Sequence, residues 1–250
     1  MKTALAILAT GDYAVGAEVM FHTLRRYGNL PDSVDCYAVG MDTCTFAQAY
    51  PLSVDYSWVR VSETHFSEVA KKFQALTLGV DRLILMDADM LCVGDCSYLW
   101  SGSIGRLPFY ACRDTASVVY YDKIIRTIGL DSSRLFNAGT MVFDFRHLPS
   151  TFHDDLLRDI ADGVCLAYDG GDQGYLNHYF QLHRYETGVL PVEYNESYDV
   201  NMPGVPDHAK RVIHFTGGNA NPWSPRLKAN DPRWRWVTRW QEEYGRCKAQ

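Results

Sequence analysis

The clearest chemistry in the sequence lies where an apolar run ends in two carboxylates. The run 83–86 is Leu-Ile-Leu-Met, and Asp87-Ala88-Asp89 follows it directly. Such a run is typical of a strand buried on both faces, and unpaired acids are costly in a dry interior. Residues two apart in an extended chain point the same way. Asp87 and Asp89 are therefore expected to aim at one point beyond the strand, where a hard divalent cation is the simplest ligand.

A candidate third ligand stands much later in the chain. His214 ends an apolar strand and precedes a glycine-containing loop. By itself it would be interpreted as a core histidine bonded to the backbone, but an Asp-x-Asp motif makes it a plausible metal ligand. Two carboxylates and an imidazole suit Mn²⁺ better than Mg²⁺, which prefers oxygen ligands and is the alternative ion. Three protein ligands leave positions for the oxygens of a diphosphate.

The elements that must position these residues alternate between strands and helices. In the first half we expect strands at 3–9, 35–39, 58–61 and 82–86, with helices at 13–27, 45–50 and 66–78. This pattern is typical of a parallel sheet with helices on both faces. In the less regular second half we expect strands at 109–112, 137–145 and 211–215, with helices at 152–161, 174–180 and 231–244. The sequence predicts a single α/β domain over residues 1–250.

Composition and charge restrict the class of function. The chain has 250 residues, of which 47% are hydrophobic, and a formal net charge of -6. It can bury a substantial core, and its charge argues against a nucleic-acid partner. No stretch approaches the ~20 apolar residues of a membrane span, and residues 3–9 are interpreted as a buried strand rather than a signal peptide. Seven scattered cysteines favour free thiols, so we expect a cytoplasmic protein.

Several motifs occur together in an order that is similar to one known family. They are Asp87-Ala88-Asp89, Asn137-Ala138-Gly139, Gly170-Gly171-Asp172-Gln173-Gly174, His214-Phe215-x-Gly217 with Pro222-Trp223, and the opening Thr10-Gly11-Asp12-Tyr13. In this order and spacing the sequence resembles glycosyltransferase family 8, the glycogenin-like enzymes. The resemblance implies a GT-A fold with a Rossmann-like, mostly parallel central sheet. It also implies a nucleotide-binding half, a sugar and acceptor half and a helical tail, at 1–105, 106–223 and 224–250.

The resemblance further implies a retaining transfer of a hexose from a UDP-sugar, with Mn²⁺. UDP-glucose or UDP-galactose is the favoured donor, and a glycan, protein or small-molecule hydroxyl is the acceptor. The implied metal ligands are Asp87, Asp89 and His214, with Asp87 also on the ribose. The implied donor contacts are Thr10 and Tyr13 on the uracil, Lys72 on the sugar or a phosphate, and the Gly217 N–H on the phosphates. The implied catalytic residues around the transferred sugar are Asn137, Asp172 and Gln173.

Structural interpretations of these residues stay open beside the functional ones. Tyr13 would serve as a core residue of its helix, Lys72 as half of a solvated pair with Lys71, and Asn137 as a turn residue. The route of transfer is also open. The acceptor could attack on the face that the phosphate leaves, or Asp172 or Gln173 could attack or stabilise the sugar cation.

The sequence departs from the family pattern at the leaving group. Asn221 stands before Pro222-Trp223, where the family often has a lysine that pairs with the diphosphate. The charge of the departing diphosphate must therefore be balanced in another way.

Tyr194 and Tyr198 lie in the region of the glycogenin self-glucosylation tyrosine, but neither can be placed in register.

Two alternative functions and one alternative role for the tail are compatible with the sequence. A phosphatase with an Asp-x-Asp nucleophile usually carries its motif at the N-terminus with Thr or Val where this chain has Leu91. A nucleotide-sugar-binding module without catalysis is supported only by Asn221. In the tail, Trp236, Trp240 and Tyr244 share one helical face, which favours docking on the domain over a membrane-surface helix. A homodimer is compatible with the sequence.

Overall fold

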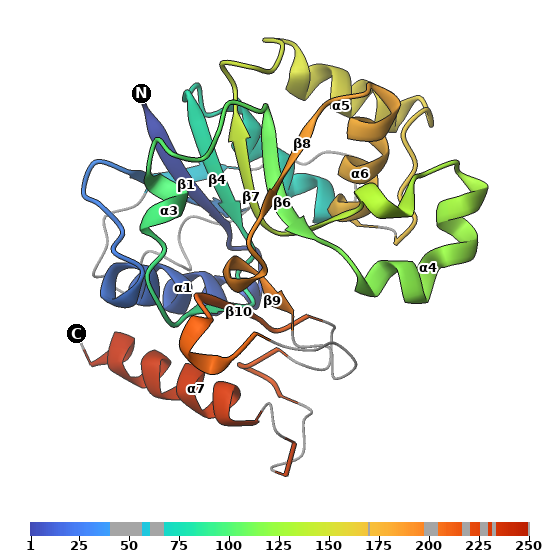
Figure 1. The fold of residues 1–250 in the computed structure, drawn as a ribbon. Helices are drawn as coiled ribbons and strands as arrows, with labels where there is room; N and C mark the ends of the chain where they lie inside the picture. The colour runs from blue at the N-terminus through green and yellow to red at the C-terminus, as the bar shows by residue number, and fades with distance from the viewer. Residues whose placement is uncertain are drawn as a thin grey trace.

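The computed structural model describes residues 1–40, 57–60, 68–169, 171–197, 205–216, 221–225, 230–231 and 234–249. The helix expected at 45–50, Gly217 and Tyr198 lie outside these residues. A seven-stranded sheet forms the centre of the described part (Figure 1). Its strands are β1 Thr3–Leu8, β2 Asp35–Gly40, β3 Ser57–Arg60, β4 Arg82–Met86, β6 Phe109–Arg113, β7 Phe136–Asp144 and β8 Thr187–Leu190.

The central sheet is mostly parallel, as predicted. Its strand order is β3-β2-β1-β4-β7-β6-β8. The pairs β3–β2, β2–β1, β1–β4 and β6–β8 are parallel, whereas β7 is antiparallel to both β4 and β6. Because β7 runs backwards, its N-terminal residues lie beside the carboxyl end of β4, with Met86 opposite Thr140. This arrangement brings the Asn137 motif to the Asp-x-Asp motif.

Helices cover both faces of the sheet, which explains the apolar strands. They are α1 Tyr13–Tyr27, the 3₁₀ helix η1 Glu68–Thr77, α3 Ser97–Trp100, α4 Ala116–Thr127, α5 Phe152–Ala161, α6 Asp172–Leu182 and α7 Trp234–Lys248. Ile84 and Met86 point into the core beneath α1. Leu83 and Leu85 point into the opposite core, under η1, α5 and α6. Residues 83–86 of β4 therefore all need to be apolar, and Figure 1 shows α1 across the sheet from α5 and α6.

A small second sheet, which the sequence analysis did not predict, lies beside the Asp-x-Asp motif. It consists of β5 Met90–Cys92, β10 Val212–His214 and β9 Glu196–Ser197, in the order β5-β10-β9. β10 runs antiparallel to β5 and places His214 opposite Met90. The pairing carries a residue from late in the chain to the edge of the central sheet.

An irregularity in β7 frees backbone groups at the same place. On β6, the neighbours Ala111 and Cys112 pair with Met141 and Asn137, so residues 138–140 have no partner on β6. Bulges of this kind often lie next to active sites, because they re-aim groups that regular pairing would consume.

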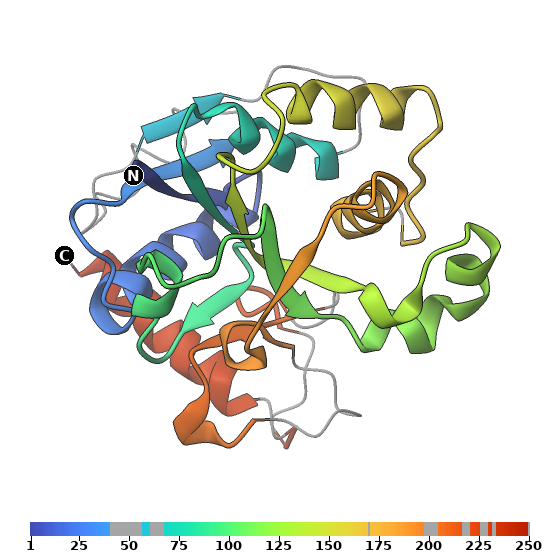
Figure 2. The ribbon, with the colours of Figure 1, turned by 45° about the horizontal axis from the view of Figure 1, so that its top comes forward.

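The C-terminal helix packs against α1 and β10, as predicted for a docked tail. Trp236, Val237 and Trp240 are buried in one cluster with Ile213 and Phe215. Figure 2 shows α7, in red, beside the blue α1. Among the described residues, no helix has the length and apolar character needed to cross a bilayer.

Candidate active site

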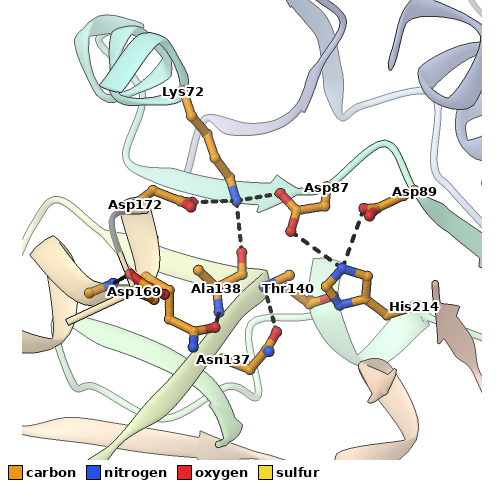
Figure 3. Close-up of polar contacts among 12 residues, drawn as sticks. Lys72, Asp87, Asp89, Asn137, Ala138, Thr140, Asp169, Asp172 and His214 are labelled. Carbon is orange, nitrogen blue, oxygen red and sulfur yellow. Dashed lines mark hydrogen bonds and ion pairs between the residues drawn. The ribbon is translucent and has the colours of Figure 1, made fainter. Parts of the chain in front are cut away.

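Three predicted metal ligands converge at the carboxyl end of β4. The Nε2 atom of His214 lies 3.3 Å from Asp89 Oδ1 and 3.5 Å from Asp87 Oδ2. One ligand atom from each side chain fits within 4.8 Å of the others. Figure 3 shows the two carboxylates facing the same ring nitrogen. Two carboxylate oxygens and one imidazole nitrogen at this spacing fit a divalent cation such as Mn²⁺.

Backbone hydrogen bonds hold the two carboxylates in place. The Asp87 N–H donates to the Gly139 carbonyl at 2.9 Å, across the β4–β7 edge. The Phe215 N–H donates to the Asp89 carbonyl at 2.8 Å, across the β5–β10 edge. Each acid is thus anchored to a different sheet, and the candidate metal centre lies between them.

Lys72 joins the metal motif to α6. Its ammonium group contacts Asp87 Oδ1 at 2.5 Å, Asp172 Oδ2 at 2.8 Å and the Ala138 carbonyl at 2.8 Å (Figure 3). Burial lowers the pKa of Lys72, but the charges of Asp172 and Asp87 outweigh it and raise the pKa above its ordinary value. Lys72 is only 2% exposed. The interpretation of Lys72 as half of a solvated pair is therefore wrong.

Burial and charge compete at the ligands. Burial raises the pKa of Asp87 to about 6, while the Lys72 ammonium opposes the rise. Burial lowers the pKa of His214, but Asp89 and Asp87 outweigh it, so the net shift is upward. A cation in the same place would compete with protons for these groups.

Gln173 and Asn137 both bind the β7 bulge. The Gln173 side-chain oxygen accepts the Ala138 N–H at 3.0 Å, and its amide nitrogen donates to Asp114 at 2.6 Å and Ser117 at 3.0 Å. Asn137 Oδ1 accepts the Gly139 N–H at 2.8 Å. Both predicted residues lie at the site, and both have structural partners there.

The N-terminus of α1 closes another side of the site. A Cβ on Gly16 would overlap the Ala88 carbonyl and the ring of Trp223, so α1 lies directly on the Asp-x-Asp loop. Tyr13 is 36% exposed and contacts Trp223 edge-on, with ring centroids 5.3 Å apart. Burial and the charges of Asp89 and Asp87 raise the Tyr13 pKa. Thr10 precedes this turn, and its carbonyl accepts the Tyr13 N–H at 3.0 Å.

The position where the family often has a lysine contacts the same tyrosine. The Asn221 side chain hydrogen-bonds Tyr13. Among the described residues, the cation nearest the metal motif is Lys72, which Asp87 and Asp172 already engage.

Sequence reasoning missed two residues that belong to this network. Asn195 contacts both His214 and Asn137, and Asp114 accepts from Gln173. Asn195 directly follows the aromatic Tyr194, and Asp114 comes two residues after the predicted strand 109–112. A polar residue at a strand end was the available signal for Asp114, but no local pattern marks Asn195.

The arrangement of sheet and site defines the class of fold. The chain matches the crystal structure of the galactosyltransferase LgtC in complex with donor and acceptor sugar analogs, with a TM-score of 0.72 at 14% identity over 97% of this chain and 95% of that one. It also matches mouse xyloside xylosyltransferase 1, with a TM-score of 0.59 at 14% identity over 88% of this chain and 99% of that one. The fold is GT-A.

The sequence then assigns the family. Residues 70–226 match the model of glycosyl transferase family 8. The chain is 30% identical to Putative UDP-glucuronate:xylan alpha-glucuronosyltransferase 5 of Arabidopsis thaliana over 84% of its length, and 29% identical to glycogenin of Komagataella phaffii over 57%. Each match spans 34% of the relative's own length. The chain belongs to glycosyl transferase family 8, as the motifs predicted.

Proposed function

We propose that this protein is a retaining glycosyltransferase that moves a hexose from a UDP-sugar to a hydroxyl of a glycan, a protein or a small molecule. The observation that carries the proposal is the convergence of Asp87, Asp89 and His214 at the carboxyl end of β4, beside the buried Lys72–Asp172 pair. The relative in Arabidopsis thaliana is named as a transferase that uses UDP-glucuronate, which supports a UDP-sugar as the donor. UDP-glucose and UDP-galactose are the donors to test first.

In this proposal Asp87, Asp89 and His214 would hold Mn²⁺, which would supply positive charge toward the departing diphosphate. Tyr13 and Thr10 hold the uracil at the N-terminus of α1. The Gly217 N–H meets the phosphates, although this residue lies outside the described part of the chain. Asn137, Asp172 and Gln173 surround the hexose.

The side-chain partners favour transfer on one face of the sugar. The ammonium of Lys72 neutralises Asp172 at 2.8 Å, and both ends of the Gln173 amide are bonded within the protein. Neither is therefore well prepared as a nucleophile. In the same-face route the acceptor oxygen bonds to the anomeric carbon as the bond to the phosphate oxygen breaks. The bonding pair leaves with UDP, and the acceptor's proton moves to the departing phosphate oxygen.

The proposal is tested first by ligand-induced stabilisation. A ligand that binds only the native state raises the melting temperature, so UDP-glucose or UDP-galactose with Mn²⁺ should raise it more than either component alone. GDP-sugars and dTDP-sugars serve as the comparison. If the melting temperature shows no shift that depends on both UDP-sugar and metal, the proposed donor site is overturned.

A point variant then tests the metal motif. Asp89→Asn removes one anionic ligand, so we expect loss of both the Mn²⁺-dependent shift and UDP-sugar hydrolysis, measured by release of UDP. Asp154→Asn is the matched control, because Asp154 is exposed on α5 far from the motif in sequence and carries the same change. Retained hydrolysis in Asp89→Asn would refute the role of Asp89. Donor binding without hydrolysis or transfer in the unmodified protein would favour a non-catalytic module.

A further inference from the structure

A row of hydrogen bonds runs from the backbone of β7 to the far side of the histidine. The Gly139 N–H donates to Asn137 Oδ1 at 2.8 Å. The Asn195 amide nitrogen donates to the same Asn137 oxygen at 2.6 Å. Asn195 Oδ1 then lies 2.8 Å from His214 Nδ1. The row ends on the imidazole nitrogen that faces away from Asp87 and Asp89.

The first donor in this row fixes the direction of every later bond. A backbone N–H can only donate, so the Asn137 atom that it meets is the carbonyl oxygen. That oxygen can only accept, so Asn195 must turn its amide nitrogen toward Asn137. The Asn195 oxygen consequently faces His214, and an amide oxygen can only accept. His214 Nδ1 must therefore carry a hydrogen.

The direction of the row decides which nitrogen can bind a metal. A neutral imidazole carries one hydrogen, and its other nitrogen has a lone pair. With the hydrogen on Nδ1, the lone pair is on Nε2, which lies 3.3 Å from Asp89 and 3.5 Å from Asp87. Without Asn195, the two carboxylates would favour a hydrogen on Nε2, because they are the remaining strong acceptors beside the ring.

Packing keeps the row intact. Asn195 is 3% exposed and His214 is 5% exposed. Gly139 lies so close that a Cβ there would overlap the His214 ring and the Asn195 carboxamide. The Asn195 backbone is also held, because its N–H donates to the Val192 carbonyl at 3.0 Å. Asn195 therefore has little freedom to rotate away from the histidine.

We propose that Asn195 is a positioning residue for the candidate metal centre: it accepts the Nδ1–H of His214 and so keeps Nε2 available as the ligand atom. The role in metal binding rests on the proposed function, whereas the assignment of the hydrogen to Nδ1 does not. Partners of this kind, which orient a ligand histidine through its second nitrogen, typically change metal affinity by about 10- to 100-fold when removed.

The experiment measures the tautomer and the metal affinity of the protein without any donor. Nitrogen-15 NMR of the metal-free protein at mildly alkaline pH should show the hydrogen on Nδ1 of His214, and Asn195→Leu should shift it toward Nε2. Titration with Mn²⁺ alone should give a dissociation constant about 10- to 100-fold higher for Asn195→Leu. Asn195→Asp still offers an acceptor to Nδ1 and should recover the tautomer, although it lowers the melting temperature because its other oxygen meets the Asn137 oxygen.

Thr140→Val is the matched structural control. Thr140 is buried and donates to the carbonyl of Tyr194, the residue before Asn195, at 2.8 Å. Loss of this hydrogen bond should lower the melting temperature but leave the tautomer of His214 and the Mn²⁺ affinity unchanged. A hydrogen on Nε2 in the unmodified protein, or an unchanged affinity in folded Asn195→Leu, would overturn the proposal. If the unmodified protein binds no Mn²⁺, the proposed function fails, and the tautomer alone decides the role of Asn195.

Discussion

At the scale of single residues, Lys72 supplies the positive charge that two carboxylates of the site share. It is buried between Asp87 and Asp172. In Lys72→Met these two carboxylates face each other without a cation, and breaking a buried ion pair typically costs about 3 to 5 kcal/mol. We expect a loss of that order in the free energy of unfolding, measured with urea at neutral pH.

A second substitution separates this charge effect from packing. The double variant Lys72→Met with Asp172→Asn removes one of the two negative charges that repel each other, so it should regain part of the lost stability. If the double variant is less stable than Lys72→Met, the ion pair is not what Lys72 contributes to folding.

Gly139 is the other residue at which a small change should matter. The clash predicted for an added Cβ involves His214 and Asn195, and overpacking of this kind costs about 1 to 3 kcal/mol. Gly139→Ala should therefore lower both the melting temperature and the affinity for Mn²⁺. Gly102→Ala is the control, because no atom lies within 4 Å of a Cβ there. Equal affinity in the two variants would mean that the close approach to His214 is unimportant.

Most of the site residues that the sequence predicted have a local signature, whereas Lys72 and Tyr13 were predicted only through the family resemblance. Asp87 and Asp89 follow a buried strand, and Asp172 follows two glycines. Asn195 has no such signature, since it contributes through His214, 19 residues away, and through the pairing of β9 with β10. Contacts set by tertiary pairing leave no pattern in either segment alone.

At the scale of elements, the contact between α1 and α7 contains a buried acid. Glu18 is fully buried on α1, and neither carboxylate oxygen has a hydrogen-bond partner among the described residues. Burial raises its pKa from 4.5 to about 7, although the charge of Lys248 on α7 opposes the rise. His22 and Glu243 form a separate contact across the same helices, with Nε2 and Oε2 3.4 Å apart.

This acid should make stability depend on pH. Below about pH 4.5 Glu18 is protonated in both the folded and the unfolded chain, so it has no cost. Between about pH 4.5 and about pH 7 the unfolded chain ionises Glu18 while the folded chain keeps it protonated, so about 3 kcal/mol of stability is lost across this range and no more is lost above it. Glu18→Gln should therefore be more stable than the unmodified protein at pH 8 and similar to it near pH 4.5, by urea unfolding.

An exposed acid on the partner helix provides the comparison. Glu242 is exposed on α7, so Glu242→Gln should keep the pH dependence of the unmodified protein. A Glu18→Gln variant whose stability advantage does not grow between pH 4.5 and pH 8 would show that folding does not raise the pKa of Glu18.

The elements that the sequence predicted best are those whose apolar residues recur with the period of a helix or follow one another in a buried strand. The helix at 152–161 has the predicted bounds, and the strands of the first half agree with prediction within a few residues. β5, with three residues, is too short to show a period, and β8 contains Gly188 and an exposed Val189. α4 was also missed, because its apolar residues Val119, Tyr120 and Ile124 are exposed rather than on a buried face.

At the scale of the whole molecule, the C-terminal helix is connected to Tyr13, at the N-terminus of α1, through aromatic rings. Trp240 is 1% exposed and lies 5.9 Å from Trp223, which lies 5.3 Å from Tyr13. In Trp240→Leu the loss of a large buried side chain should cost about 2 to 3 kcal/mol. If Tyr13 holds the uracil, the loss should also weaken UDP binding, because Trp223 loses the ring that supports it.

A tryptophan buried elsewhere distinguishes this connection from general destabilisation. Trp100 on α3 is 8% exposed, and its indole N–H donates to the Gly28 carbonyl at 3.2 Å. Trp100→Leu should cost similar stability but leave UDP affinity unchanged, as measured by titration calorimetry well below the melting temperature of both variants. A parallel loss of UDP affinity in the two would mean that α7 stabilises the fold without supporting the uracil site. A loss confined to Trp240→Leu would make the docked helix part of the donor-binding structure.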